Sequence, residues 1–256
     1  MARMRPVSHE DRLTLVEHLD ELRLRLVVCV AVLAVAFGLC FWQNHLLLEI
    51  AAGPLPSHHK KLLTFGVAEP FMITLMVSAY GALILSLPIL LYQAYAYLLP
   101  AFSPRERRVV LPIMLLAPVL FLAGVAFSYF LVMPAAVKFL LGFNESQFQV
   151  QVRAHDYYSF FSTTMLAGGV VFQLPLAILA LVRLGIVTVR QLSKNRRYAY
   201  LIISIIAAAL PGVDPISMLI EMVPLLVLFE LSILIARAFG EPKATGATVR
   251  PSTQER

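Results

Sequence analysis

Six long stretches of the chain are almost purely apolar, and short polar segments separate them. The stretches are 26–48, 70–104, 109–137, 157–182, 198–213 and 215–236. The first five contain no Asp, Glu, Lys or Arg, and a helix needs about 20 apolar residues to cross a bilayer. The pattern therefore predicts an all-α integral membrane protein with six transmembrane helices. The fifth stretch is short enough to thin the bilayer locally.

Prolines interrupt the apolar stretches at Pro88, Pro112, Pro118, Pro175 and Pro224. A proline lacks a backbone donor and tends to kink the helix that contains it. Kinked helices do not form a straight bundle, but they can form a curved wall. We therefore expect the six helices to have a kinked, concave, cup-like arrangement.

Composition places the chain among membrane proteins, because 59% of its residues are hydrophobic and only 14% are charged. Soluble domains carry about 25% charged residues. The net charge of +6 comes from basic residues scattered between apolar stretches, without interleaved aromatic residues, which argues against nucleic-acid binding. The sequence has no phosphate-cradling loop and no nucleophile with a plausible histidine base. We expect no enzyme activity, no cofactor and no metal.

Lys and Arg are divided unevenly between the two sets of segments that flank the predicted spans. Seventeen lie in the N-terminus, in the loops that contain residues 105–108 and 183–197, and in the C-terminal tail. The opposite set holds only four: Lys60, Lys61, Lys138 and Arg153. Cytoplasmic segments carry the excess of basic residues, so both termini are predicted to be cytoplasmic. Acidic residues before the first span argue against a cleavable signal peptide.

The segment before the first span has a helical pattern of its own. Its apolar stripe holds Leu15, Val16, Leu19, Leu22 and Leu26, and another face holds Glu17, Glu21 and Arg25. This spacing favours an amphipathic helix on the cytoplasmic surface that runs into the first span. The alternative is a solvated face with an intrahelical Glu21–Arg25 pair. We expect residues 1–25 to form this cytoplasmic segment, 26–236 the six-span domain, and 237–256 a disordered cytoplasmic tail.

Four polar residues inside or beside the apolar stretches are candidates for function: Gln173, Asp214, Glu221 and Glu230. A carboxylate in hydrocarbon is costly, so such groups usually face a cavity or a partner. For each, an interhelical hydrogen bond within the chain is the alternative. A secondary transporter would have internal repeats, and an intramembrane enzyme would have a catalytic pair. Neither pattern is found, so a receptor or scaffold for another membrane-inserting chain fits best, with a small-solute or ion secondary transporter as the alternative.

Six sets of short motifs, in order along the chain, point to a family. They are His18-Leu19-Asp20-Glu21-Leu22-Arg23-Leu24-Arg25, Gly53-Pro54-Leu55, Glu69-Pro70-Phe71, Tyr92-Gln93 through Pro100 to Glu106-Arg107-Arg108, Phe172-Gln173-Leu174-Pro175, and Pro211 to Ser217 with Pro224 to Glu230. From Thr14 to Arg237 the chain resembles TatC, the multispanning component of the twin-arginine protein translocase.

The resemblance implies a receptor or scaffold that binds twin-arginine signal peptides on the cytoplasmic side and directs the export of folded proteins, driven by the proton-motive force. It implies a multi-pass protein of the cytoplasmic membrane of a prokaryote. Its partners would be TatA/TatB-type single-span proteins, twin-arginine precursors and further copies of itself. Signal-peptide binding is then expected at Glu21, Arg23, Tyr97, Pro100 and Glu106. Intramembrane polar contacts and partner docking are expected at Gln173, Asp214, Met218, Glu221 and Glu230, and a structural motif at Pro54, Glu69, Pro70 and Phe71.

Three positions depart from the family pattern. Gln173 stands where Glu is frequent, so a titrating carboxylate cannot be essential there. Leu210 replaces a frequent threonine, and Met218 replaces a polar residue. Glu221 lies three residues after Met218, on a neighbouring part of one helical face. We expect Glu221 to replace the missing docking group; the alternatives are a partner within the chain or contact with outer water.

Overall fold

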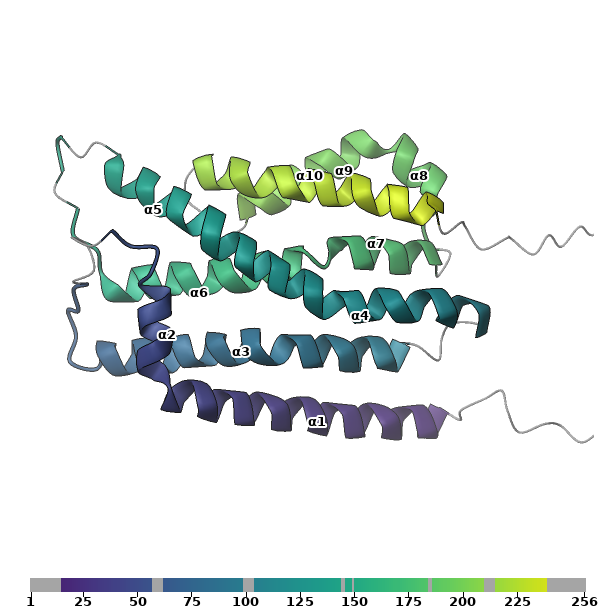
Figure 1. Cartoon of the computed structure of the whole chain (residues 1–256), viewed down its shortest axis with the longest axis horizontal. Coiled ribbons are helices and arrows are strands. Elements are labelled where there is room, and N and C mark those ends of the chain that lie inside the picture. Colours follow the sequence, from purple (N-terminus) through teal and green to yellow (C-terminus); the bar gives the residue numbers. More distant parts are fainter. Residues whose placement is uncertain are drawn as a thin grey trace, which may run out of the picture.

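The computed structural model describes residues 15–56, 62–98, 104–143, 146–148, 150–183, 186–209 and 215–238, and these residues are almost entirely helical (Figure 1). The helices are α1 Leu15–Trp42, α2 Asn44–Ala51, α3 Glu69–Leu98, α4 Pro104–Phe127, α5 Met133–Gly142, α6 Ala154–Val171, α7 Leu174–Arg183, α8 Val189–Lys194, α9 Arg196–Ala209 and α10 Pro215–Ala238. A π-helical turn, Ser128–Val132, joins α4 to α5. The predicted all-helical class is confirmed.

Five candidate membrane spans are found in the described part of the chain. They are Leu19–Trp42, Glu69–Tyr97, Leu115–Gly142, Ala154–Val182 and Pro215–Arg237. The remaining predicted helix is present as α9, but its 14 residues reach only about 21 Å. By length, therefore, five helices are suited to cross a bilayer, and the protein is a multi-span membrane protein.

Two of the spans are interrupted. The third span consists of the second half of α4, the π-helical turn and α5. The fourth is split at Phe172 and Gln173 between α6 and α7. Pro175 follows this break in the first turn of α7, where its missing N–H is tolerated. By contrast, Pro88 and Pro224 lie inside the continuous helices α3 and α10.

The amphipathic segment and the first span form one helix. α1 continues for 28 residues without interruption, so the charged face that begins the helix is a direct extension of the span. Leu19, Leu22 and Leu26 of the apolar stripe are 61%, 41% and 62% exposed, which leaves the stripe available to lipid rather than packed on the chain. The position of this segment on a membrane surface stays a prediction.

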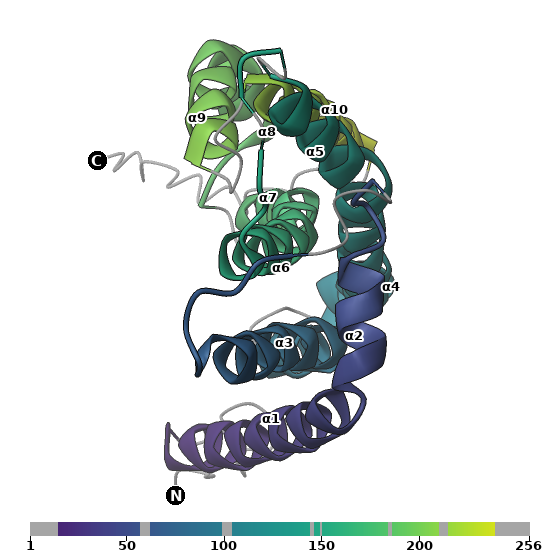
Figure 2. The ribbon, with the colours of Figure 1, turned by 90° about the vertical axis from the view of Figure 1, so that its left-hand side faces the viewer.

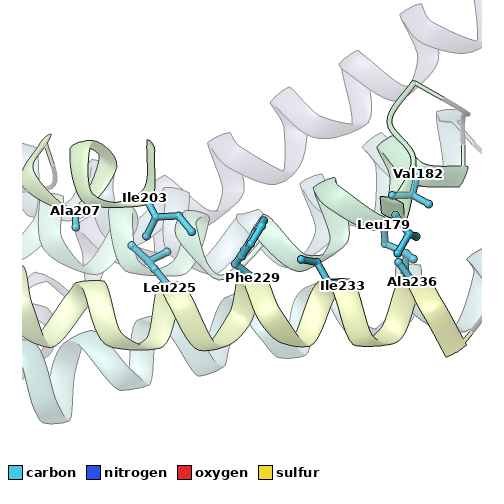
Figure 3. Packing of buried hydrophobic residues seen from close by; sticks show 9 residues of the cluster. Leu179, Val182, Ile203, Ala207, Leu225, Phe229, Ile233 and Ala236 are labelled. Carbon is cyan, nitrogen blue, oxygen red and sulfur yellow. The ribbon is translucent and has the colours of Figure 1, made fainter. Parts of the chain in front are cut away.

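Two groups of helices make up the packing. α3 packs against α1, α4 and α6, and α10 packs against α7 and α9. The largest buried cluster of the described residues belongs to the second group, where residues of α10 interleave with residues of α7 and α9 (Figure 3). Its members are Leu179, Val182, Val189, Ile203, Ala207, Leu225, Phe229, Ile233 and Ala236. Between α4 and α6 the backbones approach closely, because a Cβ on Gly124 would lie 2.5 Å from the carbonyl oxygen of Gly168.

The bundle has two ends that differ in construction, here called the α2 end and the α8 end. Seen from the α2 end, α2 runs across the long helices, which point roughly toward the viewer (Figure 2). The α8 end holds the start of α1, the end of α3, the start of α4 and α8 itself (Figure 1). Candidate polar sites lie at both ends and between them.

Candidate functional site

A three-residue polar network joins α1 to α3 at the α8 end. The Arg25 guanidinium donates from Nε and Nη2 to Oε1 of Glu21, at 2.9 and 2.6 Å. Its third nitrogen, Nη1, donates to Oε1 of Gln93 on α3 at 2.8 Å. The Arg25 and Glu21 side chains are 23% and 30% exposed, so the pair is only partly screened by solvent. The intrahelical Glu21–Arg25 pair, which the sequence left open as an alternative, is thus present.

The other residues predicted to bind a signal peptide lie at the same end where they are described. Arg23 is exposed on α1, and Tyr97 is half-buried in the last turn of α3. Glu106 lies in the first turn of α4, and its side chain is outside the described part of the structure. Pro100 lies outside the described residues altogether.

Basic residues also gather at this end, around a cavity of about 620 Å³ lined by Val189, Arg190, Ser193, Lys194, Ala236 and Arg237. Nη2 of Arg237 donates to Oγ of Ser193 at 2.7 Å, which ties the end of α10 to α8. α8 starts with a capping box, in which Thr188 and Gln191 satisfy each other's backbone N–H groups. The cavity combines positive charge with an apolar floor, which suits the edge of a membrane.

Gln173 makes its polar contact inside the chain. Its Nε2 donates to the carbonyl oxygen of Ala117 on α4 at 3.1 Å, while its Oε1 is buried and has no partner among the described residues. The residue occupies the break between α6 and α7. Gln173 therefore bridges two spans through an interhelical hydrogen bond, which is the alternative that the sequence left open for this residue. Docking of a partner at Gln173 stays a separate prediction.

Glu230 is held by α9. Its Oε1 accepts a hydrogen bond from the Tyr200 hydroxyl at 2.6 Å, and its Oε2 pairs with Nη2 of Arg196 at 2.8 Å. The Glu230 and Arg196 side chains are 38% and 42% exposed. This contact fixes the short helix α9 on α10, which gives Glu230 a structural role inside the chain.

Glu221 lies on the buried face of α10, where it is only 8% exposed. Ser217 and Leu225, one turn away on either side, are buried on the same face. Met218 is half-buried and packs on the cluster of Figure 3. This burial disfavours contact with outer water and favours a partner within the chain over direct docking by another helix. Asp214 lies outside the described residues.

At the α2 end, Glu69 organises two loops. Its Oε2 accepts from the backbone N–H groups of Phe65 and Gly66, at 2.7 and 3.1 Å, and its Oε1 accepts from Nε of Arg153 at 2.9 Å. The Glu69 side chain is only 8% exposed. The Arg153 guanidinium also lies 5.7 Å from the centre of the Phe65 ring, within cation–π range.

The backbone of these two loops is paired as well. The N–H of Leu63 donates to Val152 at 3.0 Å, and the N–H of Ala154 donates to Leu63 at 2.8 Å. Pro70 occupies the second position of α3, where a helix needs no N–H donor, and Phe71 is 56% exposed. In the sequence, Arg153 was considered only as one of the basic residues that set the orientation. Its pairing with Glu69 joins residues 84 positions apart, so no local sequence pattern predicts this pair.

Tyrosine hydroxyls cap the end of α2. Tyr157 donates to the carbonyl oxygen of Ala51 at 2.6 Å, and Tyr129 donates to that of Ile50 at 3.1 Å. The next turn contains Gly53 and the half-buried Pro54, and a Cβ on Gly53 would lie 2.5 Å from the Tyr129 hydroxyl. Carbonyl groups at a helix end need such partners when they are withdrawn from water. The proline motif thus belongs to a rigid turn.

An apolar cavity of about 570 Å³ lies between α1, α2, α3, α4 and α6. Its walls are chiefly aliphatic and aromatic, with Tyr80, Pro88, Phe130, Phe161 and Met165 among them. Among the described residues, no group of three or more His, Cys, Asp or Glu is placed to hold a metal ion. Cys29 and Cys40 are free thiols, as their separation of about three helical turns predicted.

Comparison with known proteins identifies the family. Residues 17–224 match the family model "Sec-independent protein translocase protein (TatC)". The TatC protein of Carboxydothermus hydrogenoformans is 37% identical over 91% of this chain and 97% of its own length, and that of Desulforapulum autotrophicum is 35% identical over 91% and 88%. A crystal structure of the twin arginine translocase receptor TatC superposes with a TM-score of 0.73 at 31% identity, covering 87% of this chain and 99% of the other. The resemblance found in the motifs is confirmed: the chain belongs to the TatC family of Sec-independent protein translocase proteins.

Proposed function

We propose that this protein is the receptor of a twin-arginine translocase, which binds twin-arginine signal peptides at the α8 end and directs the export of folded proteins with the energy of the proton-motive force. One observation carries the proposal. A partly exposed carboxylate, Glu21, lies at the end of the bundle where α4 starts with Glu106, in a chain of the TatC family.

The binding chemistry follows from the ligand. Two consecutive guanidinium groups are best recognised by carboxylates that can accept paired N–H donors, and such bonds strengthen near a low-dielectric interface. Glu21 and Glu106 supply the carboxylates. Arg23, Tyr97 and Pro100 shape the surrounding surface, and no catalytic group takes part. The protein acts as a receptor rather than an enzyme.

The proposed orientation places the α8 end in the cytoplasm. This is supported by the excess of Lys and Arg in the segments of that end, and it puts both termini inside. Residues 26–236 then cross the membrane six times, with α9 as a short fifth crossing that thins the bilayer, in a cup-like arrangement around the apolar cavity. Residues 1–25 and 237–256 lie in the cytoplasm of a prokaryote, beside its cytoplasmic membrane.

Labelling of single cysteines with a membrane-impermeant reagent tests this orientation, in a chain with Cys29 and Cys40 replaced by serine. Cysteine at position 60 should react from outside the cell, and cysteine at position 194 should react only after the membrane is opened. Reaction of position 194 or 106 from outside would contradict the orientation.

The proposed partners are TatA/TatB-type single-span proteins, twin-arginine precursors and further copies of this chain. The proposed docking region contains the polar residues Gln173, Asp214, Glu221 and Glu230 and the apolar residue Met218. Glu221 acts from the buried face of α10 by holding the shape of this region.

The decisive experiment is crosslinking of the full-length protein in membranes to a twin-arginine precursor, with the matching Lys-Lys precursor as control. Crosslinks near Glu21 and Glu106 that form only with the twin-arginine precursor are expected. Equal crosslinking of both precursors, or none at either residue, would contradict the receptor function.

A further inference from the structure

Three basic side chains surround the cavity of about 620 Å³ at the α8 end, and no carboxylate of the described residues pairs with any of them. Arg190 and Lys194 come from α8, and Arg237 comes from the last turn of α10. Glu230, the acid of α10 that precedes Arg237 in the sequence, is already paired with Arg196 at 2.8 Å. Within the described part of the chain, the cavity therefore keeps an uncompensated positive charge.

The cavity lies where a membrane span ends. The candidate span of α10 is Pro215–Arg237, so Arg237 is its last residue. The floor of the cavity is apolar, because Val189 and Ala236 line it and are buried. Leu234, one turn before Arg237 on a neighbouring part of the same helical face, is 63% exposed. In a bilayer such a side chain faces the acyl chains, so lipid and the basic cavity are adjacent.

From this arrangement we propose that the cavity binds the headgroup of an anionic phospholipid, with the phosphodiester on the basic side chains and the acyl chains along the exposed face of α10. Basic pockets between membrane-spanning helices are known to bind such headgroups. The volume of about 620 Å³ falls within the range of small-molecule sites, about 300–1,000 Å³. The proposal depends neither on the receptor function nor on the orientation, since lipid phosphates lie at both faces of a bilayer.

The side chains have the donors that a phosphodiester needs. A guanidinium can donate two parallel N–H bonds to phosphate oxygens, and the Lys194 ammonium adds a compact charge. Arg237 uses one of its five N–H groups to reach Oγ of Ser193 at 2.7 Å, and the others stay available. The Ser193 hydroxyl has no printed acceptor among the described residues and can donate to the phosphate in turn. Ser193 is thus a positioning residue for Arg237.

The apolar surroundings favour a lipid over a soluble anion. Inorganic phosphate or an acidic peptide would be attracted by the cations alone. A phospholipid also places apolar groups against Val189 and along Leu234, and burial of apolar surface adds to its affinity.

Native mass spectrometry of the full-length protein tests the proposal. The protein is titrated in detergent with phosphatidylglycerol or with phosphatidylcholine of the same acyl chains, and the dissociation constant of each lipid is measured. Phosphatidylglycerol should bind about tenfold more tightly, because only its headgroup has a net negative charge. Ammonium phosphate, glycerol 3-phosphate and a polyglutamate peptide are added as competitors, and none should displace the lipid at an equal concentration.

Arg190→Gln and Arg237→Gln should each weaken phosphatidylglycerol binding about fivefold and leave phosphatidylcholine binding unchanged. Arg197→Gln is the matched control. It removes a cation of the same end whose guanidinium lies 5.0 Å from the centre of the Tyr198 ring and does not line the cavity, so the affinity should change by about twofold at most.

Two further variants separate the charge from the geometry. Ser193→Ala keeps all three cations but releases Arg237, so phosphatidylglycerol binding should weaken about threefold. Arg237→Lys keeps the charge without the planar fork and should also weaken binding about threefold. It takes the place of Arg237→Gln if that variant does not accumulate.

Equal affinity for the two lipids would overturn the proposal. So would an equal loss in Arg197→Gln and in the cavity variants, because that result reports the general attraction of basic residues for anionic lipid. Displacement by ammonium phosphate or glycerol 3-phosphate would assign the cavity to a soluble phosphate, and displacement by polyglutamate would assign it to an acidic peptide. Either outcome would overturn the assignment to a lipid.

Discussion

At each end of the molecule a glutamate is paired with an arginine, but the two ion pairs have different surroundings. At the α2 end, Glu69 is only 8% exposed and accepts from two backbone N–H groups as well as from Arg153. At the α8 end, Glu21 is 30% exposed, and its arginine comes from the same helix. A carboxylate that is nearly buried between two loops is part of the architecture, whereas a partly exposed carboxylate can be reached by a ligand from solvent. A glutamate–arginine pair alone therefore does not mark a candidate binding site; the solvent exposure of the glutamate distinguishes the two pairs.

The largest effect is expected at the α8 end, from Glu106→Lys. The substitution replaces an attraction for the peptide arginines with a repulsion, so twin-arginine binding should fall about 100-fold or more, and Glu106→Gln should cost about tenfold. Peptide titration of the full-length protein in nanodiscs measures both. If both variants bind at the native level while present in normal amounts, the α8 end is not the recognition site and the comparison fails.

The next effect concerns the α2 end, where Arg153→Gln should lower the unfolding temperature by several degrees. Glu69 then keeps its backbone donors but loses its charged partner, and the contact between the two loops weakens. Thermal unfolding in detergent measures the change, with Lys138→Gln as a control that removes an exposed charge from α5. Peptide affinity of the folded protein should not change; a parallel loss of affinity would mean that the two ends are coupled.

Glu21→Gln should have a smaller effect on binding than the Glu106 variants. A partly exposed carboxylate that solvent partly screens contributes less, so twin-arginine affinity should fall about threefold. The unfolding temperature should stay at the native value, since Arg25 keeps its bond to Gln93. A marked loss of stability would show that the Glu21–Arg25 pair is architectural, like that of Glu69.

The smallest effect on stability is expected between the two ends, from Gln173→Ala. The variant loses one hydrogen bond to Ala117 but also removes a buried oxygen that has no partner among the described residues, so the free energy of unfolding should change by about 1 kcal/mol or less. Transport of a twin-arginine precursor should decrease, while peptide affinity stays unchanged. Loss of peptide affinity would assign Gln173 to the recognition site or to folding.

The sequence predicted the parts of the fold that depend on local pattern. Apolar stretches of bilayer length located the spans, and i, i+4 spacing identified the Glu21–Arg25 pair as an alternative. The pattern predicted only some of the interruptions. The break at Phe172 and Gln173 lies beside Pro175, but Pro88 and Pro224 lie inside continuous helices, and the π-helical turn at Ser128–Val132 was not predicted.

Tertiary pairs were out of reach for a different reason. Gln93 is 68 residues from Arg25, and Arg153 is 84 residues from Glu69, so each contact depends on how spans are placed side by side. The burial of Glu221 is a similar case: spacing placed it near Met218 but did not decide which neighbour covers that face. The sequence therefore identified the polar residues within the spans but did not identify the residues that they contact.

The π-helical turn at Ser128–Val132 rotates the side chains of α5 about the helix axis relative to those of α4. Each residue of an α-helix advances the side chains by about 100°, and the wider turn accommodates one residue more than an α-helical turn would. Before the turn, α4 faces α3 and α6; after it, α5 faces α10. A single crossing of the membrane can therefore serve as the common edge of two helix groups, and the angular offset between them is set by one residue of backbone.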